Sequence, residues 1–270
     1  MRPESDSVPI SAVIISKDAE GTIGATLQSL RRFAEVLVYD NGSQDRTLEI
    51  ARGFPNVRLH QGDFFGFGPT KNHAASLAEH DWIFSIDSDE QVSPELLDSI
   101  AHVNLSDPGV GYRVLRVNYL RGKRVRFSGW NNDWLLRLYN RTGTRLTDAV
   151  VHEIVQPPAE GRVVGLKGEL SHETVRELSE FLVKIDRYSE LRRAQPKRTM
   201  SPPLICLRSL WAFIRIYILQ LGVLDGWRGL VIAVSEANGV FFKYMKPYVD
   251  RVEPSMISQP VKDVLEQDPS

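Results

Sequence analysis

The stretch WIFSIDSDEQVSPE, Trp82 to Glu95, joins an apolar run to a cluster of carboxylates. Its first residues, Trp82–Phe84, predict a buried strand that leads into the acidic segment Asp87–Glu90. Like charges this close repel one another and raise one another's pKa, so such a segment needs solvent or a bound cation. Ser93 followed by Pro94 is typical of a helix N-cap and first helical position. The stretch therefore predicts a strand, an acidic turn and a helix.

The rest of the first half repeats this alternation of apolar runs and helical patterns. Strands are expected at residues 10–16, 35–40, 57–61 and 81–87, and helices at 18–34, 45–54, 70–80 and 93–103. Such alternation predicts an α/β fold with a mainly parallel sheet flanked by helices. Ligands bind beyond the carboxyl ends of parallel strands. Asp18, Asp40, Asp87 and Asp89 all lie at such ends.

The pattern changes after about residue 110. Residues 110–127 predict a hairpin around Arg121 and Gly122, residues 134–143 a further strand, and 177–195, 202–227 and 229–249 helical segments. We expect a nucleotide-binding domain at residues 1–175, a C-terminal helical appendage at 176–250 and a disordered tail at 251–270.

Composition excludes several classes of protein. The formal net charge is −1, which argues against a nucleic-acid partner. The single cysteine, Cys206, excludes an internal disulfide and fits a reducing compartment, and the N-terminus lacks the apolar segment of a signal peptide. A cytoplasmic protein is expected. Neither a G-x-G-x-x-G nor a G-x-x-x-x-G-K-[ST] motif is present, which argues against a dinucleotide dehydrogenase and a P-loop kinase.

The acidic residues and a glycine-rich segment suggest a nucleotide site. Asp87 and Asp89 can present oxygens to Mg²⁺ or Mn²⁺ that holds a diphosphate, or they form an acidic turn that caps the next helix. Asp40 and Asp18 can accept hydrogen bonds from a ribose or a base edge, or they belong to an ordinary turn. The segment GFGPTKNHA places Lys71 and Asn72 at the start of a helix, where a phosphate is favoured. An ordinary glycine loop with a solvated lysine is the alternative.

Taken together, these segments resemble glycosyltransferase family 2, whose members have the inverting GT-A fold. The likeness covers about residues 8–250 and lies in VIISKDAEGTIGATLQSL, EVLVYDNGSQDRTLEIA, GFGPTKNHAASLAEHDWIFSIDSDEQVSPEL and VHE. The subgroup it is most similar to is the lipopolysaccharide-core β-1,4-glucosyltransferases that act on heptose. The resemblance implies that Asp18 and Asp40 hold the nucleoside, that Asp87 and Asp89 form the D-x-D metal site, and that Lys71 lies near the diphosphate, where the subgroup more often has arginine.

The resemblance also implies a general base and a further metal ligand. An inverting transfer needs a base that takes the proton of the acceptor hydroxyl. The VHE segment makes Glu153 the first choice, with Asp148 as the alternative and His152 as an orienting or packed residue. His172 matches a late histidine that joins the D-x-D metal, a role that suits Mn²⁺ better than Mg²⁺. A capping or supporting role for His172 stays open.

Two further segments concern the acceptor and its location. Trp130, Asp133 and Trp134 offer aromatic faces and a carboxylate to a sugar, although one tryptophan can equally belong to a core. Residues 204–221 are apolar except for a few polar residues that include Arg208 and Arg215. Two arginines make a membrane span costly, at about 2.5–3.5 kcal/mol each, so a helix on the membrane surface is preferred over one packed on the domain or on a second subunit of a homo-oligomer.

The motifs and the resemblance together favour a metal-dependent inverting hexosyltransferase on the inner face of the inner membrane. Its expected donor is UDP-glucose, and its expected acceptor is a lipopolysaccharide-core or other glycolipid. The alternatives are a polyprenyl-phosphate glycosyltransferase, a non-catalytic sugar-nucleotide-binding membrane adaptor and a nucleotidyltransferase.

Overall fold

The computed structural model describes residues 8–131, 133–147, 154–156, 161–175, 177–193 and 200–253. The described residues form two units. The first contains residues 8–117 and 133–172, and the second contains residues 118–131 and 173–253. The predicted base candidates Asp148 and Glu153, together with His152, lie outside the described residues.

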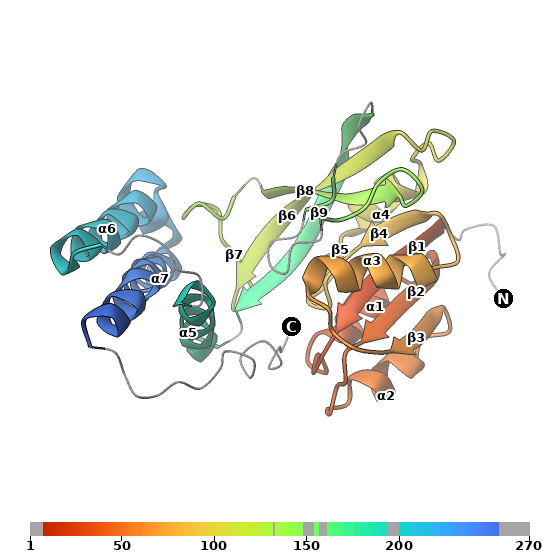
Figure 1. Ribbon diagram of the computed structural model, residues 1–270. Helices are drawn as coiled ribbons and strands as arrows, with labels where there is room; N and C mark the ends of the chain where they lie inside the picture. The colour runs from red at the N-terminus through yellow and green to blue at the C-terminus, as the bar shows by residue number, and fades with distance from the viewer. Residues whose placement is uncertain are drawn as a thin grey trace. The chain divides into compact units, whose positions relative to one another are not determined.

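The secondary structure follows the predicted alternation through the first half of the chain (Figure 1). The strands are β1 (Val8–Ser16), β2 (Phe33–Asp40), β3 (Val57–Gln61), β4 (Trp82–Ser85), β5 (Glu90–Val92), β6 (Val110–Leu120), β7 (Lys123–Arg124), β8 (Asp133–Asn140) and β9 (Arg162–Val175). The helices are α1 (Ile23–Ser29), α2 (Thr47–Arg52), α3 (Phe67–Leu77), α4 (Pro94–Ala101), α5 (Ser179–Arg193), α6 (Pro202–Ile214) and α7 (Trp227–Val252).

One mixed sheet runs in the order β3-β2-β1-β4-β8-β6-β9-β5, with β7 paired to β6. The pairs β1–β2, β1–β4 and β2–β3 are parallel, as the sequence predicted. The pairs β4–β8, β6–β8 and β5–β9 are antiparallel. The α/β fold is confirmed, and the antiparallel half is more extensive than the sequence indicated.

The first unit is buried on both faces of its parallel strands. Along β1, Ile10, Ala12 and Ile14 join a cluster with residues of α1 and α4, whereas Val13 joins a second cluster with residues of α3. Successive side chains of a strand point to opposite faces, so one strand supplies both layers. This double burial is why the strands read as continuous apolar runs in the sequence.

Two glycines set the local geometry of the later strands. The hairpin between β6 and β7 turns at Arg121 and Gly122, whose φ values of 51° and 67° match a type I′ turn and confirm the predicted hairpin. Gly168 has a φ of 89°, and a Cβ added there would lie 2.2 Å from the backbone nitrogen of Leu96. Glycine therefore lets β9 pass directly against the start of α4.

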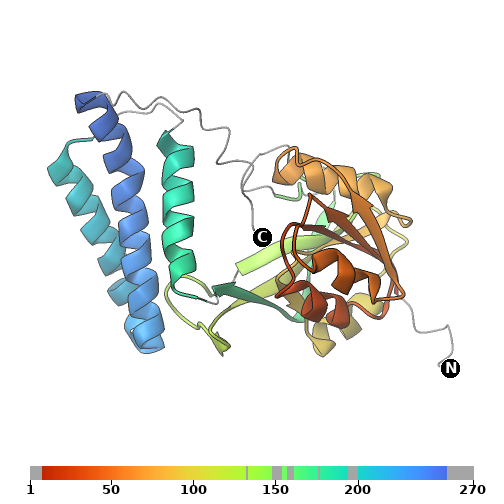
Figure 2. The ribbon, with the colours of Figure 1, turned by 90° about the horizontal axis from the view of Figure 1, so that it is seen from below.

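The second unit contains the long helices α5, α6 and α7 (Figure 2). A buried cluster that includes Val175, Phe181 and Ile232 joins these helices to residues of the hairpin. Residues Pro202–Leu219, which include a π-helical turn, are long and apolar enough to cross a membrane, with a mean hydropathy of 1.4, and 17% of them are buried. Arg208 lies over the ring of Tyr244, and Arg215 lies 3.6 Å from the carboxylate of Glu236.

Candidate functional site

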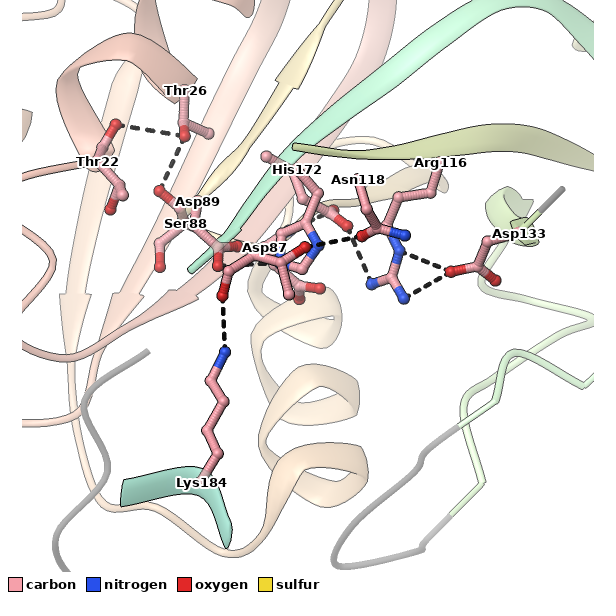
Figure 3. A network of polar contacts seen from close by, with 12 residues as sticks. Thr22, Thr26, Asp87, Ser88, Asp89, Arg116, Asn118, Asp133, His172 and Lys184 are labelled. Carbon is pink, nitrogen blue, oxygen red and sulfur yellow. Dashed lines mark hydrogen bonds and ion pairs between the residues drawn. The ribbon is translucent and has the colours of Figure 1, made fainter. Parts of the chain in front are cut away.

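The acidic turn Asp87–Glu90 lies at the carboxyl end of β4, as the sequence predicted. The Glu90 N–H donates to the Asp87 carbonyl at 3.1 Å, and the Asp87 N–H donates to the Glu90 carboxylate at 3.0 Å. From α1, the Thr26 hydroxyl donates to the carbonyl of Ser88 at 2.8 Å (Figure 3). The turn is therefore held from both of its ends and at its middle.

Asp87 lies between two cations. Lys71 Nζ donates to Asp87 Oδ1 at 2.6 Å, and Arg137 Nη2 donates to Asp87 Oδ2 at 2.8 Å. Burial by itself opposes the charged carboxylate, but the charges of Arg137 and Lys71 outweigh it and hold the pKa of Asp87 well below its ordinary value. Asp87 is therefore ionised, and each of its oxygens already has a cationic partner.

Glu90 continues this network into the interior. Its side chain is fully buried, and Oε1 accepts from Arg137 Nη2 at 2.8 Å and lies 3.5 Å from Arg116 Nη1. Burial raises the pKa of Glu90, and the nearby charge of Asp87 adds to this, against the effect of Arg137. Arg116 also forms an ion pair with Asp133 at 2.7 Å (Figure 3). Buried and half-buried charges thus form one chain of ion pairs from α3 to β8.

Asp89 meets His172 through a strand pairing that the sequence did not predict. In the pairing of β5 with β9, Glu90 lies opposite His172, and His172 Nε2 lies 3.2 Å from Asp89 Oδ2 (Figure 3). Burial lowers the pKa of His172, but its hydrogen bond to Asp89 and the charges of Asp89 and Glu90 raise it overall. His172 was expected just before a helix and is instead part of β9.

The Asp89–His172 pair fits a divalent cation as a partial donor set. Neighbouring ligands of an octahedral ion at 2.0–2.1 Å lie about 3 Å apart, close to the observed separation of these two atoms. Among the described residues, no group of three or more His, Cys, Asp or Glu side chains could hold a metal. Water and substrate oxygens would have to complete the coordination, which is common for Mg²⁺.

Asp18 and Asp40 organise the loop that follows β2. Asp40 is fully buried, and Oδ1 accepts from the N–H groups of Gly42 and Ser43 at 3.0 and 2.9 Å. Asp18 is exposed, has a φ of 50° and accepts from the Gln44 N–H at 2.7 Å. The two carboxylates therefore fix adjoining parts of one loop at the carboxyl end of the sheet.

Asn72 lies one residue after Lys71 on α3, but its amide contacts the backbone of a distant segment. Asn72 Nδ2 donates to the carbonyl of Leu146, and the Leu146 N–H donates to Asn72 Oδ1, each at 3.0 Å. Leu146 in turn pairs with Val155, and the Thr147 N–H donates to the Ile154 carbonyl at 2.9 Å. Asn72 therefore holds the segment that leads into residues 148–153.

The three predicted acceptor residues are divided between the two units. Trp130 belongs to the second unit, where its ring packs against Phe181 with centroids 6.3 Å apart. Asp133 belongs to the first unit, at the start of β8, and pairs with Arg116. Trp134 is 40% exposed, with the guanidinium of Arg113 over its ring.

Arg137, Arg116 and Glu90 are members of this site that the sequence did not predict. Arg137 interrupts the apolar run of β8 and is 7% exposed. A lone charged residue inside a buried strand is the signal that was available, because such a charge needs a partner. Its partners lie some fifty residues earlier in the chain, so only the folded structure identifies them.

The chain is similar to known glycosyltransferases. A family model described as glycosyl transferase family 2 matches residues 11–163. Over 253 residues the chain is 30% identical to the lipopolysaccharide core biosynthesis glycosyltransferase LpsC of Rhizobium meliloti (strain 1021). This match covers 89% of this chain and 92% of LpsC. Over 253 residues the chain is also 25% identical to the uncharacterized glycosyltransferase RT0209 of Rickettsia typhi. That match covers 88% of this chain and 86% of RT0209. Among solved structures, S. aureus TarS 1–349 in complex with UDP-GlcNAc aligns with a TM-score of 0.46 and 14% identity, over 90% of this chain and 92% of that one.

Proposed function

This chain belongs to glycosyl transferase family 2, and on that basis we propose that it is a metal-dependent inverting hexosyltransferase. The proposed donor is a nucleoside diphosphate sugar, UDP-glucose in the first instance. The proposed acceptor is a lipopolysaccharide-core or other glycolipid, by analogy with the relative LpsC. The proposal depends mainly on one observation. The side chains of Asp89 and His172 lie 3.2 Å apart at the carboxyl end of β4, beside the Lys71–Asp87 ion pair.

Asp89 and His172 would hold the divalent metal, which is Mg²⁺ or Mn²⁺. A carboxylate and an imidazole form a donor set suited to Mn²⁺ in particular. When bound, the ion neutralises negative charge on the departing nucleoside diphosphate. Asp87 would support this site from the side, since Lys71 and Arg137 already occupy its oxygens.

Lys71 and the loop after β2 would bind the remainder of the donor. Lys71 is 5% exposed and lies in the first half of α3, where a cation and the positive end of a helix favour a phosphate. Asp18 is exposed at the carboxyl end of β1, which suits hydrogen bonds from the nucleoside. Asp40 is buried, so its contribution would be to hold the loop that contacts the nucleoside.

The general base would come from residues 148–153. We propose Glu153 for this role, with Asp148 as the alternative. Support comes from the fixed ends of this segment, because Leu146 is bonded to Asn72 and Thr147 to Ile154. A base that takes the proton of the acceptor hydroxyl must be held near that hydroxyl.

The second unit would hold the enzyme on the cytoplasmic face of the inner membrane. Large apolar side chains of α6 and of the turn that follows it are about half exposed: Leu204, Leu207, Leu210, Trp211, Ile218, Leu219, Val223 and Leu224. Exposed apolar areas of this kind mark protein or membrane contacts. Arg208 and Arg215 both contact α7, so the apolar face itself carries few charges. A surface-bound helix therefore fits this segment better than a spanning one.

A donor screen tests the proposed function directly. Purified enzyme is incubated with a panel of nucleoside diphosphate sugars and Mn²⁺ or Mg²⁺, with and without glycolipid acceptors, and nucleoside diphosphate release is measured. Release with one donor, increased by an acceptor and abolished by a chelator, is the expected result. Binding of a donor without release across the panel would instead favour a non-catalytic adaptor, and release of pyrophosphate would favour a nucleotidyltransferase.

A further inference from the structure

We propose that Arg137 is a positioning residue that fixes the acidic turn so that Asp89 and His172 can share one metal ion. This inference rests on the proposed function, because it assumes a metal at that pair. Arg137 itself would not contact the metal or the donor. It would act through the residues on either side of Asp89.

Arg137 binds both flanks of Asp89 with one nitrogen atom. Its Nη2 donates to Asp87 Oδ2 and to Glu90 Oε1, each at 2.8 Å. Arg137 lies on β8 next to β4, where Leu138 is the partner of Phe84. Its side chain is therefore anchored in the sheet that ends at the turn, and the distance between the two carboxylates is set by a single donor.

Glu90 links the position of the acidic turn to the position of His172. Glu90 is the first residue of β5 and lies opposite His172 in the β5–β9 ladder. Its second oxygen, Oε2, accepts from the Asp87 N–H, which closes the turn. The position of Glu90 thus determines both where the turn ends and where His172 enters the site.

The positive charge of Arg137 is a second reason why the acidic turn needs this residue. Without Arg137, Asp87 would keep only its ion pair with Lys71 among the contacts described above. Glu90 would keep only Arg116, whose Nη1 lies 3.5 Å from its carboxylate. Two carboxylates on one turn repel each other across a poorly solvated gap. The turn would relax by spreading, which would separate Asp89 from His172. Lysine at this position would keep the charge but lose the planar group that donates in fixed directions.

The test compares Mn²⁺ binding in Arg137→Met, Arg137→Lys and wild-type protein, with Arg141→Met as the matched control. Arg141 lies just after β8, pairs with Asp81 and donates to the carbonyls of Ala75 and Ala78, so its loss also removes an ion pair and partly buried hydrogen bonds, but away from the turn. Free Mn²⁺ is measured by electron paramagnetic resonance in the presence of UDP, below the melting temperature of each variant.

We expect the Mn²⁺ dissociation constant to rise at least tenfold in Arg137→Met and at least threefold in Arg137→Lys, and to change less than twofold in Arg141→Met. High Mn²⁺ concentrations should restore much of the lost kcat of Arg137→Met, with the acceptor KM unchanged. A purely structural role predicts a lower melting temperature with unchanged Mn²⁺ affinity, and that result would overturn the inference. If Arg137→Met fails to fold, Arg137→Lys decides the question by the same criterion.

The wild-type measurement separates this inference from the proposed function. Wild-type protein that binds no Mn²⁺ with UDP present would refute the metal site itself, and the inference with it. Wild-type protein that binds Mn²⁺ while Arg137→Met binds it equally well refutes the role of Arg137 alone. Nucleoside diphosphate release by the wild-type protein in the donor screen tests the transferase activity separately from the role of Arg137.

Discussion

Asn72 offers a sharp test, because the sequence and the structure suggest different roles for it. The sequence predicts a substrate-binding residue beside Lys71. In the structure its amide makes two hydrogen bonds of 3.0 Å to the backbone of Leu146, a residue that is 2% exposed. We therefore expect Asn72→Ala to destabilise the protein and to slow catalysis without weakening donor binding.

The two hydrogen bonds set the expected size of the effect. Each contributes about 1 kcal/mol net, and a buried backbone group left without a partner adds a further penalty. The expected loss in the free energy of unfolding is roughly 2–3 kcal/mol, which for a domain of this size lowers the melting temperature by about 5–10 °C. Residues 148–153 follow directly after the released segment, so kcat should fall while the donor dissociation constant stays within about twofold.

The assay combines thermal unfolding, calorimetric titration with UDP and steady-state kinetics. Asn41→Ala is the matched control, because Asn41 also donates to two carbonyls, those of Gly62 and Asp63, but at 3.3 Å in an exposed loop. We expect a smaller loss of stability there. An Asn72→Ala protein with an unchanged melting temperature and a markedly weaker affinity for UDP would refute the anchoring role and support the substrate-binding one.

Four further outcomes can be measured independently. Asp89→Asn should reduce transfer by roughly 10²–10³-fold, because a metal supplies several kcal/mol of transition-state stabilisation. A melting temperature near that of the wild type would show that the fold is retained. Near-normal turnover would exclude the metal role of Asp89. Gly168→Ala should cost about 2 kcal/mol or more in urea unfolding, because its φ is 89° and the added Cβ would meet the backbone of α4; an unchanged midpoint would contradict this. Burial opposes the charge of Asp45, but hydrogen bonds from the Thr47 hydroxyl and from backbone N–H groups lower its pKa. The stability that the Asp45 carboxylate adds is therefore complete above its ordinary pKa of about 4 and is lost as the pH falls through its lower folded pKa. The loss of stability in Asp45→Asn, measured by denaturant titration, should therefore be smaller at acidic pH than at neutral pH. Trp211→Ser, on α6, should reduce co-sedimentation with anionic vesicles, whereas Leu182→Ser, which removes an even more exposed apolar side chain on α5, should not; equal losses would argue against the α6 face.

The parallel half of the fold could be predicted because its signal is local. Strands that are buried on both faces read as continuous apolar runs, and each is followed within a few residues by a helix start such as Ser93, whose hydroxyl accepts from the Leu96 N–H. Once the strands are parallel, their carboxyl ends must share one edge. That geometric rule puts Asp18, Asp40, Asp87 and Asp89 at one edge of the sheet, and the spacing of the last two added the prediction of a metal site.

The missing parts depend on contacts distant in sequence. In β9 the buried residues Leu166, Leu170 and Val175 are irregularly spaced, and Gly168 interrupts the period of two, so residues 162–175 did not read as a strand. Without that strand, His172 could not be placed opposite Glu90. The pairing of Arg137 with Asp87 and Glu90 joins segments 47 to 50 residues apart, which no local pattern encodes.

The crowding of carboxylates in the segment Asp87–Glu90 follows from how their charges are compensated. Asp87 is balanced by Lys71 and Arg137, and Glu90 by Arg137 and Arg116. Asp89 is bonded to His172, an imidazole that is itself a metal ligand when neutral. In the proposed site, a divalent ion would take over the compensation of Asp89 without displacing any arginine or lysine. The neighbouring acids would then hold Asp89 in place, which would explain why the carboxylates occur together in one segment.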